Sequence, residues 1–350
     1  MKFSPATSFR LPAEWEPHRS TIICWPHQKE DWPGKFAPIP WVYVEILKHL
    51  AQSELVRVIV QAEQDVSRVH KLLERAHGEI ENIEFIIAKT DRSWMRDTTP
   101  AFVKNQEGAT IGIPFQFNGW AKYSNWKKDR KIPQILSKVL DVPFVPPIYQ
   151  KHEFILEGGA IDSNGQGTLL ATEECLLDEQ TQVRNAGFTR ADYEAVFRQY
   201  LGVQKTIWLK NGIAGDDTHG HIDDVCRFVN HNTLVLCREK NTSEINFSST
   251  EKNFERLQGT TLADGSNVNV VSLPMPAPLY FENLRLPASY ANFYIANTVV
   301  LVPTFNDPND RQALGMISEF FPERTVVGIH ATDLVWGLGT LHCLAHEEPA

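Results

Sequence analysis

The sequence lacks an excess of basic residues. Its 34 Lys and Arg stand against 43 Asp and Glu, which gives a formal net charge of -9. This sign does not suit a surface that follows the phosphates of a nucleic acid or an anionic membrane, but it suits the attraction of a cation. We therefore expect neither nucleic acid nor a membrane as a partner.

Long apolar runs and internal linkers are also missing. No stretch approaches the roughly 18 apolar residues of a transmembrane helix, and residues 1–15 contain no apolar core of a signal peptide. We therefore expect a cytoplasmic protein. No linker rich in Pro, Gly or Ser and no block of like charge divides the chain. With 42% hydrophobic residues to form a core, the sequence predicts a single domain over residues 1–350.

Cysteine is scarce and has no motif. The five cysteines are an odd, scattered set without a CxxC pair, which argues against a disulfide framework and against a structural zinc site. Most are expected to be small buried apolar residues, and one could be a nucleophile.

Candidate helices recur at a nearly constant spacing. Residues 63–77 carry apolar side chains on one helical face, and residues 190–201 lie between Thr189, a candidate N-cap, and Gly202. Fainter candidates are 41–50, 133–140, 250–257 and 310–320. Helix starts at 63, 133, 190, 250 and 310 give steps of 70, 57, 60 and 60 residues. These steps indicate an internal repeat.

Candidate strands surround these helices in a regular order. Two apolar runs joined by a turn, as in 226–229 and 234–237, precede a helix, and a short apolar run follows it. The other predicted hairpins join 101–103 to 110–113, 160–161 to 168–171 and 293–296 to 299–302, and the runs after the helices are 142–145, 206–209, 268–273 and 325–329. A hairpin implies an antiparallel pair and a helical crossover implies a parallel one. The sequence therefore predicts an α/β fold of about five units, each a mixed sheet with a helix on one side.

The loops between one unit and the next hold the residues with reactive or charged side chains. Asp97, Glu157, Asp223, Asn292 and Cys343 serve as markers, with spacings of 60, 66, 69 and 51 residues. Equivalent points of units arranged in a ring would meet at its axis. We therefore expect one site that combines three carboxylates, a histidine and a cysteine.

His221 and Cys343 are the candidate base and nucleophile. His221 lies two residues before Asp223, so on a strand both side chains would share a face. A thiol needs a base or a nearby cation to ionise at neutral pH, and an imidazole can both take and return a proton. Carboxylates match the forked N–H donors of a guanidinium, which stays protonated at physiological pH. The pattern thus favours a substituted guanidine as the substrate.

Simpler interpretations of single residues remain open. Asp97 and Glu157 could only cap turns, and Trp120 could be a packing aromatic. His342 neighbours Cys343, but adjacent strand residues point to opposite faces, so we expect a structural role for His342.

A metal site is a further alternative. His219, His221, Asp223 and Cys226 could be grouped as ligands, but their spacing matches no common zinc pattern.

Several motifs resemble those of a known family. In chain order they are WMRD, FNGW, LEGG, GDDTHGHIDD, RLPASYANFYIAN and GLGTLHC. Together they resemble the agmatine deiminases and the related bacterial peptidylarginine deiminases, within the guanidine-modifying, or pentein, superfamily. The resemblance extends from EWEPH at residues 14–18 almost to the C-terminus. Each motif is weak alone, but their common order is specific.

The resemblance implies a five-bladed α/β propeller of ββαβ modules, with the site on a pseudo-fivefold axis. It implies a hydrolase that converts a substituted guanidine, with agmatine as the first candidate, to N-carbamoylputrescine and ammonia, as part of putrescine and polyamine metabolism. It implies no metal and no organic cofactor, and a small cationic guanidine as the partner. A homo-oligomer is left open.

The resemblance also implies the catalytic residues. Cys343 would attack the guanidinium carbon and form a covalent thiouronium intermediate. His221 would protonate the departing ammonia and then activate water, and Glu157 would orient His221.

The substrate-binding residues implied in the same way are Asp97 and Asp223, which would hold the guanidinium nitrogens, and Trp94, which would form a pocket wall. After FNGW the chain departs from the family. Agmatine deiminases usually carry a glycine-rich, aspartate-bearing loop there, whereas this sequence reads AKYSNWKK over residues 121–128. Lys127 and Lys128 do not favour a second amine, so the guanidine end of the pocket is better defined by the sequence than the specificity.

Other activities fit the same residues. A deiminase of free or peptidyl arginine would need an Arg or Lys near the pocket mouth, and the lack of a secretion signal argues against a secreted peptidyl enzyme. An amidinotransferase would share the nucleophile. A guanidine-binding module without turnover is the non-enzymatic alternative, and the presence of Cys343 with His221 argues against it.

Overall fold

The computed structural model describes residues 9–78 and 81–350. Residues 1–8, part of the segment in which no signal peptide was predicted, lie outside the described residues, as do residues 79–80. Within the described ranges, no helix combines the length and the apolar character that crossing a membrane requires.

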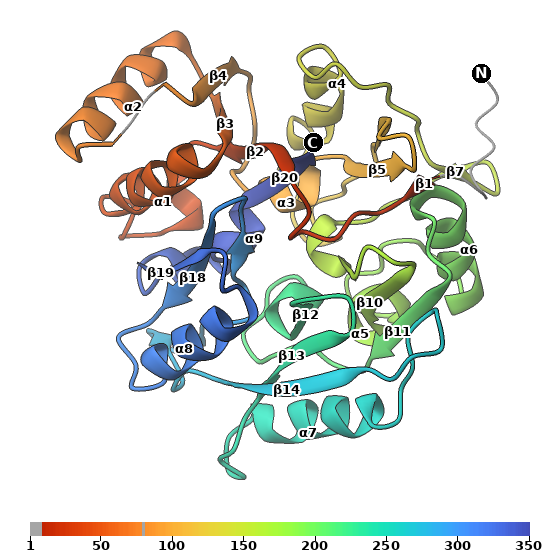
Figure 1. Cartoon of the computed structure of the whole chain (residues 1–350). Coiled ribbons are helices and arrows are strands. Elements are labelled where there is room, and N and C mark those ends of the chain that lie inside the picture. Colours follow the sequence, from red (N-terminus) through yellow and green to blue (C-terminus); the bar gives the residue numbers. More distant parts are fainter. Residues whose placement is uncertain (1–8, 79–80) are drawn as a thin grey trace.

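Five mixed or antiparallel sheets of three or four strands, counted over the described residues, are arranged around the middle of the molecule (Figure 1). Three of them share one plan, in which an antiparallel hairpin is followed by a helix and a parallel strand. Their strands are β9 (Asp162–Ser163), β10 (Thr168–Thr172) and β11 (Lys205–Leu209); β12 (Cys226–Phe228), β13 (Thr233–Arg238) and β14 (Asn269–Pro274); β17 (Tyr294–Ile295), β18 (Val299–Thr304) and β19 (Thr325–His330). The crossover helices are α6 (Arg190–Leu201), α7 (Asn246–Leu257) and α8 (Asp310–Phe320). The predicted order of hairpin, helix and strand is confirmed for these three units.

Helix α6 shows why the local sequence was informative. The Thr189 side chain accepts a hydrogen bond from the Asp192 amide, and the Asp192 carboxylate accepts one from the Thr189 amide, which together form a capping box. Gly202 ends the helix at φ 68°, in the left-handed region, where a β-carbon would also collide with the carbonyl oxygen of Phe9. Both ends of the predicted helix are therefore confirmed.

The sheet β20-β2-β3-β4 joins the two ends of the chain. The last strand, β20 (Ala345–Pro349), pairs antiparallel with β2 (His18–Cys24), which continues in parallel to β3 (Leu55–Val60) and β4 (Ile83–Ile87). Helix α1 (Ile39–Ser53) connects β2 to β3, and α2 (Glu63–Arg75) connects β3 to β4. By its strand pairing, α1 is the counterpart of α6, α7 and α8.

The choice of residue 63 as a repeat start is therefore wrong. The sequence pattern of α2 is clear because its polar and apolar faces are sharply separated, although the helix buries only Val69 and Leu73. Helix α1 buries residues on more of its circumference, including Tyr43, Ile46 and Leu50, which weakens the one-sided pattern.

The remaining sheet, β1-β5-β6, is less regular than predicted. It contains β1 (Phe9–Arg10), β5 (Ala101–Asn105) and β6 (Thr110–Ile113), and the predicted hairpin of β5 and β6 is confirmed. Helix α4 (Ile132–Leu136) ends four residues before the predicted 140, and the run 142–145 forms only an isolated parallel bridge between Gly112 and Phe144. Two small hairpins, β7 (Ile148–Tyr149) with β8 (His152–Glu153) and β15 (Tyr280–Phe281) with β16 (Leu284–Arg285), lie in the connecting loops.

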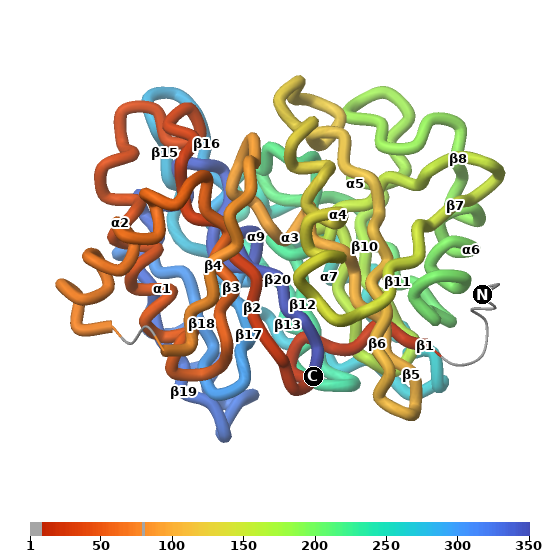
Figure 2. The backbone as a smooth tube through the Cα atoms, turned by 90° about the horizontal axis from the view of Figure 1, so that it is seen from above, coloured from red at the N-terminus to blue at the C-terminus, as the bar shows by residue number. Residues whose placement is uncertain are grey.

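A short turn precedes the first hairpin strand of each sheet. Four of these turns are helical: α3 (Met95–Thr98), η3 (Gly158–Ala160), η4 (Ile222–Asp224) and α9 (Leu341–Leu344). The fifth is the loop before β17. Turn α3 contacts both α9 and η3, and η3 contacts η4; Figure 2 shows α3 and α9 side by side in the middle of the molecule. Turn η3 also explains why the strand predicted at 160–161 begins only at Asp162.

Candidate active site

The five marker residues meet at these turns. Asp97 lies on α3, Glu157 immediately before η3, Asp223 on η4, Asn292 before β17 and Cys343 on α9, and all are buried. The Cys343 thiol lies 3.2 Å from the Asn292 amide nitrogen and 3.7 Å from Asp223 Oδ2. The predicted convergence of distant loops is present in the structure.

His221 lies on the other side of the same carboxylate. Its Nδ1 atom is 4.0 Å from Asp223 Oδ1 and 4.0 Å from Asp97 Oδ1. Since Asp223 faces Cys343 with one oxygen and His221 with the other, the candidate nucleophile and the candidate base belong to one site. The imidazole is only 1% exposed.

Asp97 is held by two donors. The Gly159 amide donates to Oδ1 at 3.0 Å, and the Trp120 indole donates to Oδ2 at 2.8 Å. Each carboxylate oxygen accepts two hydrogen bonds, so both can still receive an N–H from a ligand. Trp120, which the sequence left as a packing aromatic, is therefore part of the site, and its position in the FNGW motif was the available signal.

Gly159 is required by close packing rather than by an unusual backbone angle. A β-carbon at this position would lie 2.5 Å from His221 Nδ1 and 3.0 Å from Asp97 Oδ1. The lack of a side chain thus lets the imidazole and the carboxylate approach the same backbone segment.

We expect Gly159→Ala to lower kcat on the order of 100-fold, because a displacement of the base by about 1 Å is enough for such a loss. Steady-state kinetics measure the effect. Gly315→Ala on α8 is the matched control, since its β-carbon would meet open space. Equal kinetics of both variants would show that the close contact with His221 does not matter.

Glu157 pairs with an arginine that the sequence analysis missed. Arg184 Nε lies 3.0 Å from Glu157 Oε1, and both side chains are fully buried. The guanidinium of Arg184 also donates to the carbonyl oxygens of Gln182 and Thr218. No local pattern predicts this pair, because its two residues are 27 positions apart in the sequence.

Glu157 lies close to His221 without bonding to it. Ligand atoms of Glu157, Cys175 and His221 lie within 4.8 Å of one another, which is the one group of metal-ligand types that the described residues bring together. The grouping of His219 with His221 is not found, because the His219 ring bonds to Asp178 at 2.9 Å. Since Glu157 already pairs with Arg184, we assign this trio to the surroundings of the base.

Burial disfavours the charged forms in the site. It raises the pKa of the Cys343 thiol well above its ordinary value, and the nearby carboxylates of Asp223, Asp224 and Asp97 add to the effect. Burial also lowers the pKa of His221 well below its ordinary value, helped by Arg184. These shifts favour a thiol beside a neutral imidazole, and a positive charge placed next to the thiol would favour the thiolate.

Burial also disfavours the charged forms of the carboxyl groups of Asp97 and Asp223. Burial, followed by the charge of Glu157, raises the pKa of Asp97 to about 7. Burial, followed by the charge of Asp97, raises the pKa of Asp223 well above its ordinary value. Two acids facing one buried space thus disfavour each other's ionisation unless a positive charge lies between them.

Some buried polar atoms of the site have no hydrogen-bond partner among the described residues. They are His221 Nε2, Asp223 Oδ1 and Glu157 Oε2. Buried polar atoms are normally satisfied, so unpaired atoms around one charged space suggest a ligand with several donors. A guanidinium offers five N–H groups in a plane.

A partly open pocket of about 110 Å³ is lined by Cys343 and Asp97. Trp94 is among the residues that line this pocket. Its ring packs so closely on Gly337 and Gly339 that a β-carbon would lie 3.0 and 2.9 Å from ring atoms. Charged and aromatic residues also line the pocket, including Glu30, Asp31, Arg92, Tyr123 and Asp217.

Charges at this mouth are already partly paired. Arg92 binds Asp31 at 2.8 Å, Lys122 pairs with Asp217, and the Tyr123 hydroxyl donates to Asp217 at 2.6 Å. Lys128, whose charge was expected to oppose a second amine, instead pairs with Asp91. Lys122 thus contacts the pocket lining through Asp217.

The chain is similar to proteins of one family. Residues 10–349 match the model of the Porphyromonas-type peptidyl-arginine deiminase family. The agmatine deiminase of Pseudomonas fluorescens (strain SBW25) is 34% identical over 368 residues, which cover 99% of this chain and 96% of that protein. The agmatine deiminase of Pseudomonas aeruginosa (strain LESB58) is 32% identical over 368 residues, with the same coverage of 99% and 96%.

Solved structures show the same likeness in three dimensions. The agmatine deiminase of Enterococcus faecalis, described as catalysing its reaction, superposes with a TM-score of 0.89 at 28% identity, covering 100% of this chain and 98% of that chain. A cysteine variant of the agmatine deiminase of C. jejuni with substrate bound superposes with a TM-score of 0.86 at 28% identity, covering 98% and 96%.

Proposed function

The chain belongs to the Porphyromonas-type peptidyl-arginine deiminase family, and from this premise we propose that it is a hydrolase that converts agmatine to N-carbamoylputrescine and ammonia. The observation that carries the proposal is the buried meeting of Cys343 and His221 with the acids Asp97 and Asp223, whose ionisation calls for a cation. This reaction would place the protein in putrescine and polyamine metabolism.

The fold is an α/β fold of the pentein type, as its similarity to agmatine deiminase structures shows. We further propose that residues 1–350 form one five-bladed propeller of ββαβ modules. The five sheets around one centre support this proposal, as does the turn before each first hairpin strand. The site would then lie on the pseudo-fivefold axis.

The proposed reaction begins when the guanidinium enters between Asp97 and Asp223. Its positive charge stabilises the Cys343 thiolate, which adds to the guanidinium carbon and forms a tetrahedral adduct. The proton that leaves the thiol reaches the departing nitrogen through His221. Ammonia then leaves, and a thiouronium joined to Cys343 remains.

Hydrolysis completes the cycle. His221 takes a proton from water, and the resulting hydroxide adds to the same carbon. The C–S bond then breaks while the O–H bond of the adduct breaks to form the C=O of the ureido product. The hydroxyl proton returns to the Cys343 sulfur, and His221 gives its own proton to bulk water. Glu157 stabilises the positive charge that His221 carries in between, acting from beside the ring with Arg184 as its fixed partner. Trp94 supports the substrate chain as a wall.

The pocket mouth favours an amine over a carboxylate at the far end of the substrate. Glu30, Asp31 and Asp217 line it against the cations Arg92 and Lys122. The acids therefore outnumber the bases that touch them, which favours agmatine. Arginine is the second candidate, because Arg92 lies in the lining and could bind a carboxylate if it left Asp31.

The function is tested by incubating the protein with agmatine, arginine, arginyl peptides and methylated arginines while ammonia and ureido products are measured. Agmatine is expected to give the highest kcat/KM. A higher kcat/KM for arginine would make arginine the substrate instead. If none of these compounds gave ammonia and a ureido product, the deiminase proposal would be wrong.

We expect Lys122→Ala to lower the KM for agmatine a few-fold, because it frees the Asp217 carboxylate for the substrate's ammonium. The pair is partly exposed, so the effect should stay within about 1 kcal/mol. Lys128→Ala is the matched control, since Lys128 pairs with Asp91. A raised KM for agmatine in Lys122→Ala would contradict this view of the pocket mouth.

A further inference from the structure

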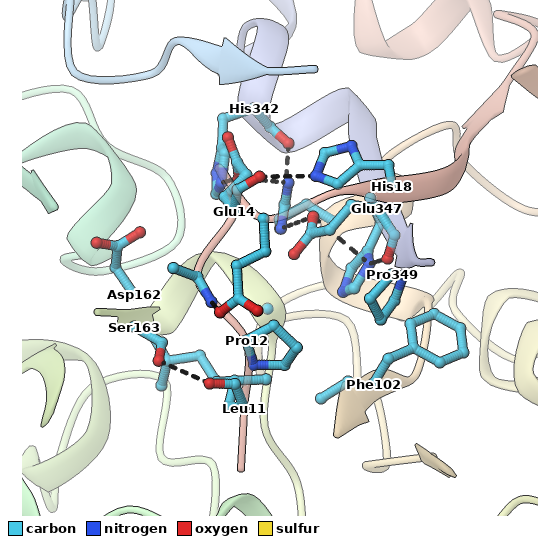
Figure 3. A pocket seen from close by; sticks show the side chains of 17 residues that line it. Leu11, Pro12, Glu14, His18, Phe102, Asp162, Ser163, His342, Glu347 and Pro349 are labelled. Atoms are coloured by element: carbon cyan, nitrogen blue, oxygen red, sulfur yellow. Dashed lines mark hydrogen bonds and ion pairs between the residues drawn. The ribbon is translucent and has the colours of Figure 1, made fainter. Parts of the chain in front are cut away.

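Behind the site, His342 connects Asp223 to a second buried acid. Its Nδ1 atom lies 2.7 Å from Asp223 Oδ2, and its Nε2 atom lies 2.7 Å from Glu14 Oε2. All three side chains are buried, and His342 is 1% exposed. Figure 3 shows His342 and Glu14 next to each other on the wall of a second cavity of about 50 Å³.

His342 and Cys343 face different cavities. Cys343 lines the substrate pocket, whereas His342 lines the second one. The expected reason, alternation along a strand, is wrong, because residues 341–344 form the helical turn α9. The structural role predicted for His342 leaves its two short contacts with carboxyl groups unexplained.

These two contacts fix the number of protons in the chain Asp223–His342–Glu14. Each distance of 2.7 Å between a ring nitrogen and a carboxyl oxygen requires one proton between the atoms. A neutral imidazole carries only one N–H. A second proton is therefore present, and it resides on His342 as imidazolium or on one of the two carboxyl groups.

Of the two carboxyl groups that His342 connects, that of Glu14 stays ionised. Its Oε2 atom also accepts from Arg96 at 3.0 Å, and its Oε1 atom accepts from the Ile295 amide at 2.8 Å and lies 3.1 Å from Arg227. The two arginines and His342 hold the pKa of Glu14 well below its ordinary range, against the effect of burial.

Asp223 is the end that favours the proton in the empty site. It is fully buried, and burial followed by the charge of Asp97 raises its pKa well above the ordinary value. The nearby charges of Arg227 and Arg96 oppose this shift without reversing it. His342 itself faces Glu14, Arg96 and Arg227, and burial followed by the two arginines lowers its pKa well below the ordinary value. In the empty site the second proton thus lies on Asp223, which donates to Nδ1.

We propose that His342 is a positioning residue that takes this proton from Asp223 when the guanidinium binds. The proposal rests on the proposed function, since it needs a cation beside Asp223 Oδ1, the oxygen that has no partner in the described structure. The O–H bond of Asp223 breaks, the N–H bond of Nδ1 forms, and the imidazolium remains between two carboxylates. Asp223 becomes an anion at the substrate without releasing a proton to water.

The test counts protons during binding. The inactive Cys343→Ser chain is titrated with agmatine by calorimetry in two buffers of different ionisation enthalpy, with and without His342→Gln. A glutamine amide can still donate to Glu14, but it cannot take up a proton. We expect His342→Gln to release about one more proton per agmatine bound, and to bind more weakly as the pH falls.

His346→Gln, also in the Cys343→Ser chain, is the matched control. His346 lines the same cavity and bonds the Glu347 carbonyl oxygen, and its replacement should leave the proton count unchanged. Equal proton counts with and without His342 would overturn the relay while leaving the deiminase proposal intact. A complete lack of agmatine binding in Cys343→Ser would instead remove the proposed function and the relay with it.

A second measurement needs no change at His342 and covers the case in which His342→Gln does not fold. In the Cys343→Ser chain, the infrared band of a protonated buried carboxyl should disappear when agmatine binds. The same band should be missing in an additional Asp223→Asn variant. A band assigned to Asp223 that persists in the agmatine complex would overturn the proposal.

Discussion

Cys343→Ser should abolish turnover of agmatine while the protein still binds it. A serine hydroxyl is far less acidic than a thiol, so neither the cation nor His221 can make it a nucleophile at neutral pH. We expect kcat to fall by at least about 10⁴-fold, the range seen when a nucleophile is removed. Single-turnover mass spectrometry should detect the covalent adduct in the parent chain and none in the variant.

Cys24→Ser is the matched control for this result. The Cys24 thiol is buried outside the site and lies 3.6 Å from the Trp25 carbonyl oxygen and 3.5 Å from the Thr90 hydroxyl, so a serine hydroxyl would find partners there. Its kinetics should match those of the parent. Turnover retained by Cys343→Ser would exclude the covalent mechanism, and turnover lost in both variants would point to damage of the fold.

The fold could be predicted from the sequence where local signals agree with the pairing. Helix α6 has both caps, and α8 begins and ends at the predicted residues 310 and 320. The sheet β20-β2-β3-β4 could not be predicted, because β20 at the end of the chain pairs with β2 near its start and no local pattern indicates that contact. Residues 142–145 form only an isolated bridge in place of the predicted strand. A short apolar run forms a strand only where a partner strand is within reach.

The candidate site, like the fold, could be predicted only in part. The similar spacings of Asp97, Glu157 and Asp223, 60 and 66 residues, indicate that these residues meet, because one structural position recurs in each unit. The family resemblance, now confirmed over residues 10–349, supplied their expected roles. Neither the repeat nor the resemblance predicted the pairing of Arg184 with Glu157 or the contact between His342 and Glu14. They join side chains that are 27 and 328 positions apart in the sequence and that meet only in the folded chain.

Asp97→Asn should lower kcat/KM for agmatine by about 10³-fold. The carboxylate faces the space for the guanidinium in a buried site, and removing one partner of such a pair costs about 3–5 kcal/mol. An asparagine amide keeps the size of the side chain but would turn an NH₂ group toward either the Gly159 amide or the Trp120 indole, both of which are donors. Steady-state kinetics and calorimetric titration with agmatine measure the loss.

The same substitution should change how the free energy of unfolding of the free protein depends on pH. The pKa of Asp97 is raised from 3.8 to about 7 by burial and by Glu157. A raised pKa adds stability below pH 3.8, and this contribution is lost as the pH rises through about 7, by a few kcal/mol. Asp97→Asn should therefore flatten the stability curve between about pH 4 and 7, as measured by denaturant unfolding.

Asp129→Asn separates the two effects of this substitution. Asp129 is also buried with a pKa raised to about 7, but it accepts backbone N–H groups of Asp91 and Arg92 away from Cys343. It should flatten the same part of the stability curve and change kcat/KM little. If Asp97→Asn left kcat/KM near the parent value, Asp97 would not bind the guanidinium. If it left the stability curve unchanged, the acid would be ionised in the empty site, and the cation would not be needed to balance its charge.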